Sequence, residues 1–170
     1  ALPLAAASAA DRAFDAAVKA FHDTFYDRAE AQLADFRQKV PTSPRLPEAI
    51  LLQAQARLEL SNYAGAIELL SANQAAAGTN ADQFLFWLAE AHSRKGDSRA
   101  AADAFAKAVK DFPASPRRLE AAIGEASARS ALARARISWQ GTITPMLMTS
   151  KLLHCKTTPT MFLPMSCTSP

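Results

Sequence analysis

A repeat with a fixed spacing constrains this chain more than any other feature of its sequence. Residues 41–45 read Pro-Thr-Ser-Pro-Arg, and 72 positions later residues 113–117 read Pro-Ala-Ser-Pro-Arg. A Glu-Ala dipeptide follows three residues after the arginine of each copy. Half of this spacing is close to the period of repeats that are built from two helices. The sequence therefore predicts stacked helical hairpins.

Alanines mark the half-period of the repeat. Spacings of 37, 35 and 37 residues separate four of them, and three more follow twelve residues after the first three. A small residue lets two helices approach closely, so we expect these alanines to pack between helices. The seven alanines are Ala17, Ala54, Ala89, Ala126, Ala29, Ala66 and Ala101.

The composition up to residue 136 favours helices over strands. Alanine dominates this stretch, together with Leu, Glu, Gln, Arg and Lys, which are strong helix formers. Turn residues separate the apolar runs, and Pro41, Gly78 and Pro113 mark where hairpins end. We predict an all-α solenoid of about three and a half antiparallel hairpins, over residues 11–40, 45–77, 80–112 and a half hairpin at 117–135. The expected helices are 11–23, 26–40, 45–60, 63–77, 80–94, 98–112 and 117–135.

The two ends of the chain differ from the repeats. Residues 1–10 are rich in alanine and contain Ala-Ser-Ala, the form of a signal-peptidase site, so we expect a signal-peptide remnant there, or else a frayed helix start. After Arg136 the acidic residues disappear, and all four Met and both Cys lie in this last segment. Because prolines interrupt it, residues 137–170 are expected to form an irregular tail, either a genuine, poorly ordered one or out-of-frame translation.

The sequence offers no pattern that is typical of an active site, a metal site or a cofactor site. The net charge of +3 is too small to indicate nucleic-acid binding. The histidines His22, His92 and His154 lack the spacing of zinc ligands, and no glycine-rich phosphate loop or nucleophile elbow is present. We therefore expect neither catalysis nor a cofactor.

The pattern resembles the tetratricopeptide repeat (TPR), which has small residues at its eighth and twentieth positions and proline at its thirty-second. Ala17, Ala29 and Pro41 match, as do Ala89, Ala101 and Pro113, whereas Gly78 replaces the proline of the second repeat. Within that family, residues 26–48 and 98–120, with the motif at 40–45 and 112–117, resemble bacterial envelope repeat proteins. These are outer-membrane-assembly lipoproteins and periplasmic proteins that coordinate wall synthesis with constriction.

The resemblance implies a concave surface, lined by the first helix of each hairpin, that binds a partner segment. Alternatively, half of these residues pack against the neighbouring hairpin. The implied groove residues are Phe14, Val18, Phe21, His22, Leu51, Gln55, Leu58, Glu59, Phe86, Glu90, Ser93 and Arg94.

Three hypotheses for the function follow from these patterns. The first is a non-catalytic scaffold of the bacterial envelope that binds a protein or peptide, exported to the periplasm or the outer-membrane periphery. The second is the accessory module of a larger wall-cleaving or sugar-transferring enzyme, and the third is a cytoplasmic adaptor. No nucleic-acid partner is expected, and a membrane would be reached only through an anchor or a partner. Self-association through the incomplete fourth hairpin is a further expectation, because its helix lacks a second helix to cover it.

Overall fold

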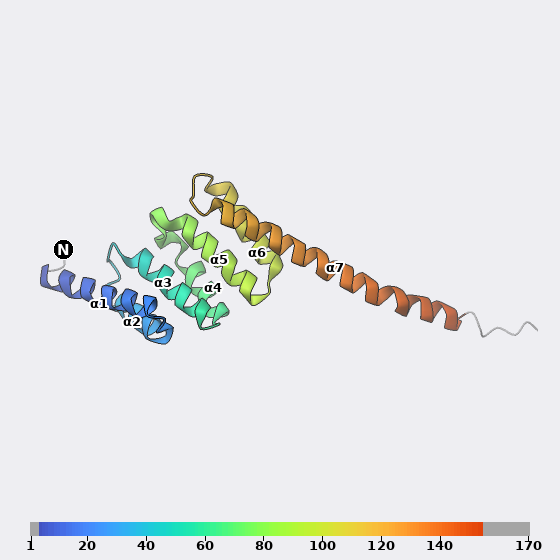
Figure 1. The fold of residues 1–170 in the computed structure, drawn as a ribbon, viewed down its shortest axis with the longest axis horizontal. Helices are drawn as coiled ribbons and strands as arrows, with labels where there is room; N and C mark the ends of the chain where they lie inside the picture. The colour runs from blue at the N-terminus through green and yellow to red at the C-terminus, as the bar shows by residue number, and fades with distance from the viewer. Residues whose placement is uncertain (1–3, 155–170) are drawn as a thin grey trace, which may run out of the picture. The chain divides into compact units, whose positions relative to one another are not determined.

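The computed structural model describes the backbone of residues 4–154 and the side chains of residues 9–137. Within this part of the chain the structure contains α-helices and short 3-10 turns, and no strand. None of the described helices is both long and apolar enough to cross a membrane. The elements are α1 (Leu4–His22), α2 (Tyr26–Lys39), α3 (Leu46–Glu59), α4 (Tyr63–Ala72), η1 (Gln74–Ala76), η2 (Gly78–Asn80), α5 (Ala81–Lys95), α6 (Ser98–Asp111) and α7 (Arg118–His154) (Figure 1).

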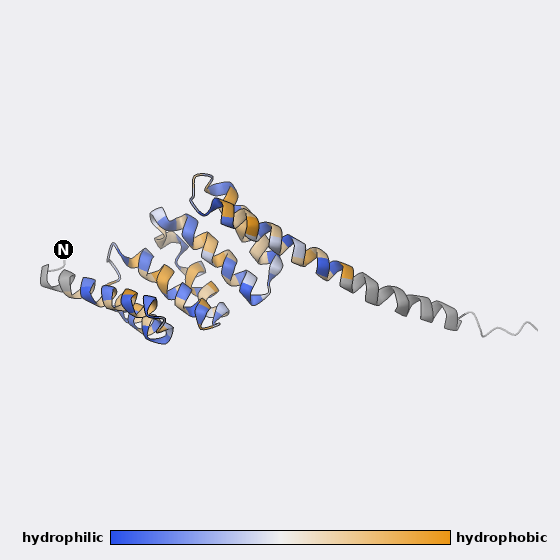
Figure 2. Cartoon of the chain, in the orientation of Figure 1, coloured by the Kyte–Doolittle hydropathy of each residue, from blue (hydrophilic) through white to orange (hydrophobic). Residues whose placement is uncertain are grey.

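The chain divides into two compact units, residues 1–132 and 133–170. In the first unit, the hairpins α1–α2, α3–α4 and α5–α6 follow one another, and each helix packs against the next one (Figure 1). The first helices also contact each other, α1 with α3 and α3 with α5. Apolar and polar residues alternate along these helices, as expected where one face of a helix is buried (Figure 2). The predicted all-α array of helical hairpins is confirmed.

The seven repeat alanines divide into two groups in the structure. Ala126 on α7 is exposed, contrary to the expectation that it packs between helices. The physical reason is that α7 continues as one long helix. The other six alanines have no exposed surface at all: Ala17, Ala29, Ala54, Ala66, Ala89 and Ala101.

Enlarging a buried alanine should destabilise the array. We expect Ala54→Leu or Ala89→Leu to lower the free energy of unfolding by about 1–3 kcal/mol, because the added atoms overpack a closed interface. Ala31→Leu is the matched control, since Ala31 lies exposed on α2. Thermal melts followed by circular dichroism measure the difference. Unchanged melting of both core variants would contradict the helix register described here.

One turn conformation recurs in all three hairpins. Thr24, Ser61 and Gly96 occupy equivalent positions and have positive φ angles of 63°, 60° and 90°. The helix that follows is then capped in two of the hairpins, because Asn62 accepts a hydrogen bond from the backbone N–H of Gly65 and Asp97 accepts one from that of Ala100. The left-handed residue reverses the chain between two antiparallel helices.

Two helix boundaries in the first unit differ from the sequence-based expectation by more than one residue. α1 begins at Leu4 instead of residue 11, because the alanine-rich stretch that resembles a signal-peptide remnant is also an excellent helix former. α4 ends at Ala72 instead of residue 77. There Asn73 donates a side-chain hydrogen bond to the carbonyl of Leu69, and two 3-10 turns follow.

The last helix is longer than the expected 117–135. α7 continues through Pro145 to His154, and residues 155–170 lie outside the described part of the chain. Pro145 removes one backbone donor and costs about 3 kcal/mol inside a helix, which weakens α7 locally without ending it.

Candidate partner-binding surfaces

Four of the predicted groove residues lie in the core. Phe14 packs against Phe36 with ring centroids 5.5 Å apart, and Phe86 packs against Phe105 at 5.9 Å. Leu51 and Leu58 are also buried. These side chains hold the hairpins together, so they are not available to a partner. A first helix has one apolar face, and the neighbouring helices cover it.

The other eight predicted residues are reachable from solvent. Val18 and Phe21 on α1 are half-buried, and so are Gln55 on α3 and Glu90 on α5. Their contact with a partner stays a prediction. We call all eight residues, the four half-buried and the four exposed ones, the first-helix surface. Its residues are Val18, Phe21, His22, Gln55, Glu59, Glu90, Ser93 and Arg94.

Arg94 joins two hairpins on the first-helix surface. Its guanidinium donates to Glu90 on the same helix at 2.9 Å and to Glu59 on α3 at 3.1 Å. The hydrogen bond to Glu90 has the largest effect on the pKa of Arg94 and raises it. Burial lowers this pKa, but together with the hydrogen bond to Glu59 the net pKa lies above its ordinary value. The two carboxylates therefore hold a permanent positive charge in a fixed place.

The repeated Pro-x-Ser-Pro-Arg motif proves to be a link between successive hairpins. The guanidinium of Arg45 lies 4.8 Å from the ring centroid of Phe14, and that of Arg117 lies 4.8 Å from Phe86. In each copy the serine hydroxyl accepts a hydrogen bond from the backbone N–H of the arginine at 3.2 Å. A cation over an aromatic face contributes about 0.5–2 kcal/mol. The repeat of the motif in the sequence indicated that these positions matter, but it did not predict that the arginines contact aromatic rings.

A partly buried polar network joins the first two hairpins. Gln53, which is buried, accepts a hydrogen bond from Arg37 at 2.7 Å and donates one to Glu30 at 3.0 Å. Arg57 donates to the same Glu30 oxygen at 2.9 Å and to the carbonyl oxygen of Gly65. The sequence pattern did not predict these residues, because helical spacing does not reveal partners 16 to 27 positions apart.

The network predicts that stability decreases in acid. Burial alone would raise the pKa of Glu30, but the hydrogen bonds from Gln53 and Arg57 lower it below its ordinary value of 4.5. A carboxylate with a lowered pKa contributes stability above its ordinary pKa, and that contribution is lost as the pH falls through the folded value. We expect wild type to lose more stability than Glu30→Gln between pH 7 and pH 3 in urea unfolding experiments. Asp35→Asn, which removes an exposed partner of Lys39, should behave like wild type.

Trp87 on α5 is half-buried and packs mainly within the protein. Its ring lies edge-on to Phe86 with centroids 5.5 Å apart, and Arg117 lies 5.1 Å from it. Its indole Nε1 is shielded from solvent without a hydrogen-bond partner. Core packing therefore accounts for Trp87 better than a role as a surface anchor.

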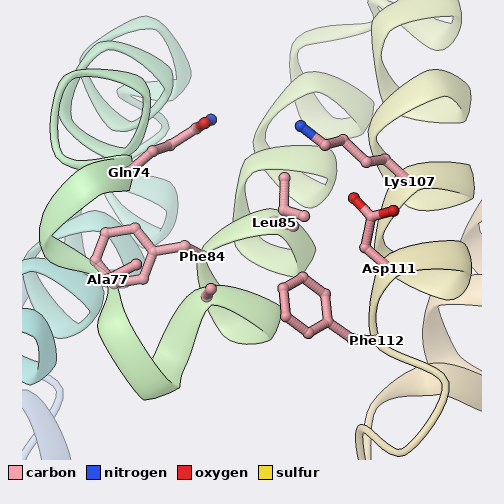
Figure 3. Close-up of a pocket in the computed structure, with 8 residues that line it drawn as sticks. Gln74, Ala77, Phe84, Leu85, Lys107, Asp111 and Phe112 are labelled. Atoms are coloured by element: carbon pink, nitrogen blue, oxygen red, sulfur yellow. The ribbon is translucent and has the colours of Figure 1, made fainter.

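A small cavity lies between the end of the second hairpin and the third. It has a volume of about 200 Å³, with Phe84, Leu85 and Phe112 as its apolar wall (Figure 3). Lys107 and Asp111 project toward the cavity from α6 (Figure 3). Ligand pockets usually measure about 300–1,000 Å³. This cavity is large enough for one side chain of a partner and too small for a typical cofactor. Among the described residues, no cluster of His, Cys, Asp and Glu could hold a metal ion.

The stacked hairpins define a TPR-like helical repeat protein. The sequence matches no protein-family model and no curated protein. Among solved structures it is similar to PcrH from Pseudomonas aeruginosa, with a TM-score of 0.59 and 19% sequence identity. The match covers 79% of this chain and 94% of PcrH. At this identity the likeness shows the fold alone.

Proposed function

We propose that this protein is a non-catalytic scaffold that binds a segment of another protein on its first-helix surface, and that it works in the bacterial cell envelope. The observation that carries the proposal is the continuity of this surface over three hairpins. α1 contacts α3, α3 contacts α5, and Arg94 links α5 to Glu59 on α3. An array of this kind can bind an extended or helical segment longer than a single hairpin could hold.

The chemistry of the surface suits a polar segment with a few apolar residues. The amide of Gln55 can both donate and accept, as recognition of a peptide backbone requires. Val18 and Phe21 add half-buried apolar area at one end of the surface. The charges of Glu59, Glu90 and Arg94 can fix the orientation of the bound segment. A segment bound in the reverse direction would place like charges next to them, which is costly.

Site-specific photo-crosslinking tests the proposed surface. A photoreactive amino acid replaces Gln55 on α3 in one variant and Gln38 on α2 in a matched variant. Both are surface glutamines, but Gln38 lies outside the first-helix surface. We expect a defined protein adduct in bacterial cells from position 55 and none from position 38. Equal labelling from both positions, or adducts from position 38 alone, would refute binding on the first-helix surface.

The proposed location rests on the resemblance of residues 26–48 and 98–120 to bacterial envelope repeat proteins. Fractionation of bacterial cells that express a tagged form of the full gene product tests this location. We expect the protein in the periplasmic or outer-membrane fraction. Recovery in the cytoplasm alone would favour a cytoplasmic adaptor and leave the crosslinking result unaffected.

A further inference from the structure

The cavity shown in Figure 3 lies where the array departs from its own repeat. The links at residues 40–45 and 112–117 carry the Pro-x-Ser-Pro-Arg motif, whereas the link between the second and third hairpins lacks it. There α4 ends early, and the two 3-10 turns η1 and η2 lead into α5. Gln74 and Ala77 of this irregular link line the cavity together with residues of α5 and of the end of α6. The space between these two hairpins therefore accompanies the change of link.

The cavity faces away from the first-helix surface. Ala81 lines the cavity, and Glu90, nine residues further along α5, belongs to the first-helix surface. At about 3.6 residues per turn this separation is about two and a half turns, so the two side chains project from opposite sides of the helix. A ligand in the cavity would leave the first-helix surface free, so the two can be occupied independently.

The wall of the cavity is apolar. Phe84 and Leu85 on α5 are buried, and Phe112 extends the wall at the end of α6 (Figure 3). The volume of about 200 Å³ leaves room for a single side chain of medium size. Enclosing an apolar side chain removes its surface from water, which favours binding in proportion to the area covered. The wall therefore selects for one apolar side chain.

The opening of the cavity is polar. Gln74 on η1 and Lys107 on α6 point toward one another across it (Figure 3). Asp111 lies one turn after Lys107 on α6 and also lines the cavity. The ammonium group and the amide offer hydrogen-bond donors, whereas the carboxylate offers only acceptors. The opening therefore presents a positive and a negative group to the same ligand.

Lys107 and Asp111 do not neutralise one another. Where an acidic residue precedes a basic one by four positions, ion pairs form at Asp35–Lys39, Glu90–Arg94 and Glu125–Arg129. Lys107 and Asp111 have the reverse order, which is the less favourable one on a helix. Within residues 9–137, neither side chain takes part in an ion pair. Both charges are therefore left for a ligand.

We propose that this cavity binds a free α-amino acid with an aliphatic side chain, of the size of leucine or methionine. The side chain packs against the apolar wall. The α-carboxylate accepts hydrogen bonds from Lys107 and Gln74, and the α-ammonium group donates to Asp111. A residue inside a polypeptide carries neither of these charges, so the opposite charges at the opening favour the free amino acid over a segment of a protein.

Isothermal titration of the full chain with L-leucine tests the site. We expect saturable binding of one molecule per chain, and binding of L-alanine at least about tenfold weaker, because a smaller side chain leaves the apolar wall uncovered. Lys107→Gln and Asp111→Asn should each weaken L-leucine binding about three- to tenfold, since both charges are exposed to solvent. Lys110→Gln and Asp103→Asn are the matched controls, because both residues are exposed on α6 and neither lines the cavity.

Two analogues assign each charge of the ligand to its partner. L-Leucinamide lacks the carboxylate, so Lys107→Gln should leave its affinity unchanged. N-acetyl-L-leucine lacks the ammonium group, so Asp111→Asn should leave its affinity unchanged.

Four results would overturn the proposal. The first is no saturable binding of L-leucine or L-methionine, and the second is an equal affinity for L-alanine. The third is a loss in the control variants as large as the loss in Lys107→Gln and Asp111→Asn. The fourth is that N-acetyl-L-leucinamide, which has neither charge, binds as tightly as L-leucine. The cavity would then accept a side chain of a protein instead of a free amino acid.

Discussion

Leu51→Asp is expected to unfold the second hairpin instead of weakening partner binding. Leu51 lies on the buried face of α3, in the same apolar cluster as Ile50 and Leu70. The change removes apolar contacts and places a carboxylate in a site without a partner for its charge. We expect a loss of about 4 kcal/mol or more in the free energy of unfolding, which is a large part of the stability of a small domain.

Urea unfolding followed by circular dichroism measures this effect. Gln55→Asp is the control, because it introduces the same side chain one turn further along α3 at a half-buried position. That variant should lose no more than about 1 kcal/mol, and it should lower partner binding if the proposed surface is used. If Leu51→Asp is folded and binds the partner more weakly, Leu51 lies in an accessible groove as first predicted, and the assignment to the core is wrong.

Phe105→Ala is expected to detach the third hairpin from α7. Phe105 contacts Phe86 and belongs to a core cluster that includes Ala121 and Ala128 of α7. A Cβ atom at Gly124 would lie only 2.6 Å from the Phe105 ring, so glycine allows α7 to pack directly against this ring. Truncating a buried Phe to Ala costs about 3–5 kcal/mol.

The fluorescence of Trp87 reports this change directly, because the indole packs against the same cluster. With Trp139→Phe as background, Phe105→Ala should shift the unfolding midpoint of Trp87 far below that of the parent. Phe25→Ala is the matched control. Phe25 is exposed at a hairpin turn, so its removal should change stability by about 0.5 kcal/mol or less. Equal shifts for the two variants would mean that Phe105 is not a core residue.

The repeat explains why so much of the fold was predictable. Small residues, turn residues and prolines act within one or two turns of the chain, and they recur in three hairpins. The positions of Thr24, Ser61 and Gly96 illustrate this, because each begins the same reversal. The sequence also predicted the close approach of helices at the buried alanines.

The site was less predictable, since a spacing rule does not say which side of a helix meets a neighbour. Phe14, Leu51 and Phe86 were assigned to a groove because they lie on first helices, yet the second helices cover them. The polar network of Glu30, Gln53 and Arg57 joins residues far apart in sequence, so only packing could reveal it.

The amino-acid sequence by itself determined the hairpin period, the antiparallel register and the chemistry available on each helix, because these depend on local propensity and on spacing. The tertiary structure alone decided which apolar residues close the core and which polar ones meet across hairpins. These outcomes depend on contacts between segments that are distant along the chain, and such contacts exist only when the hairpins stack.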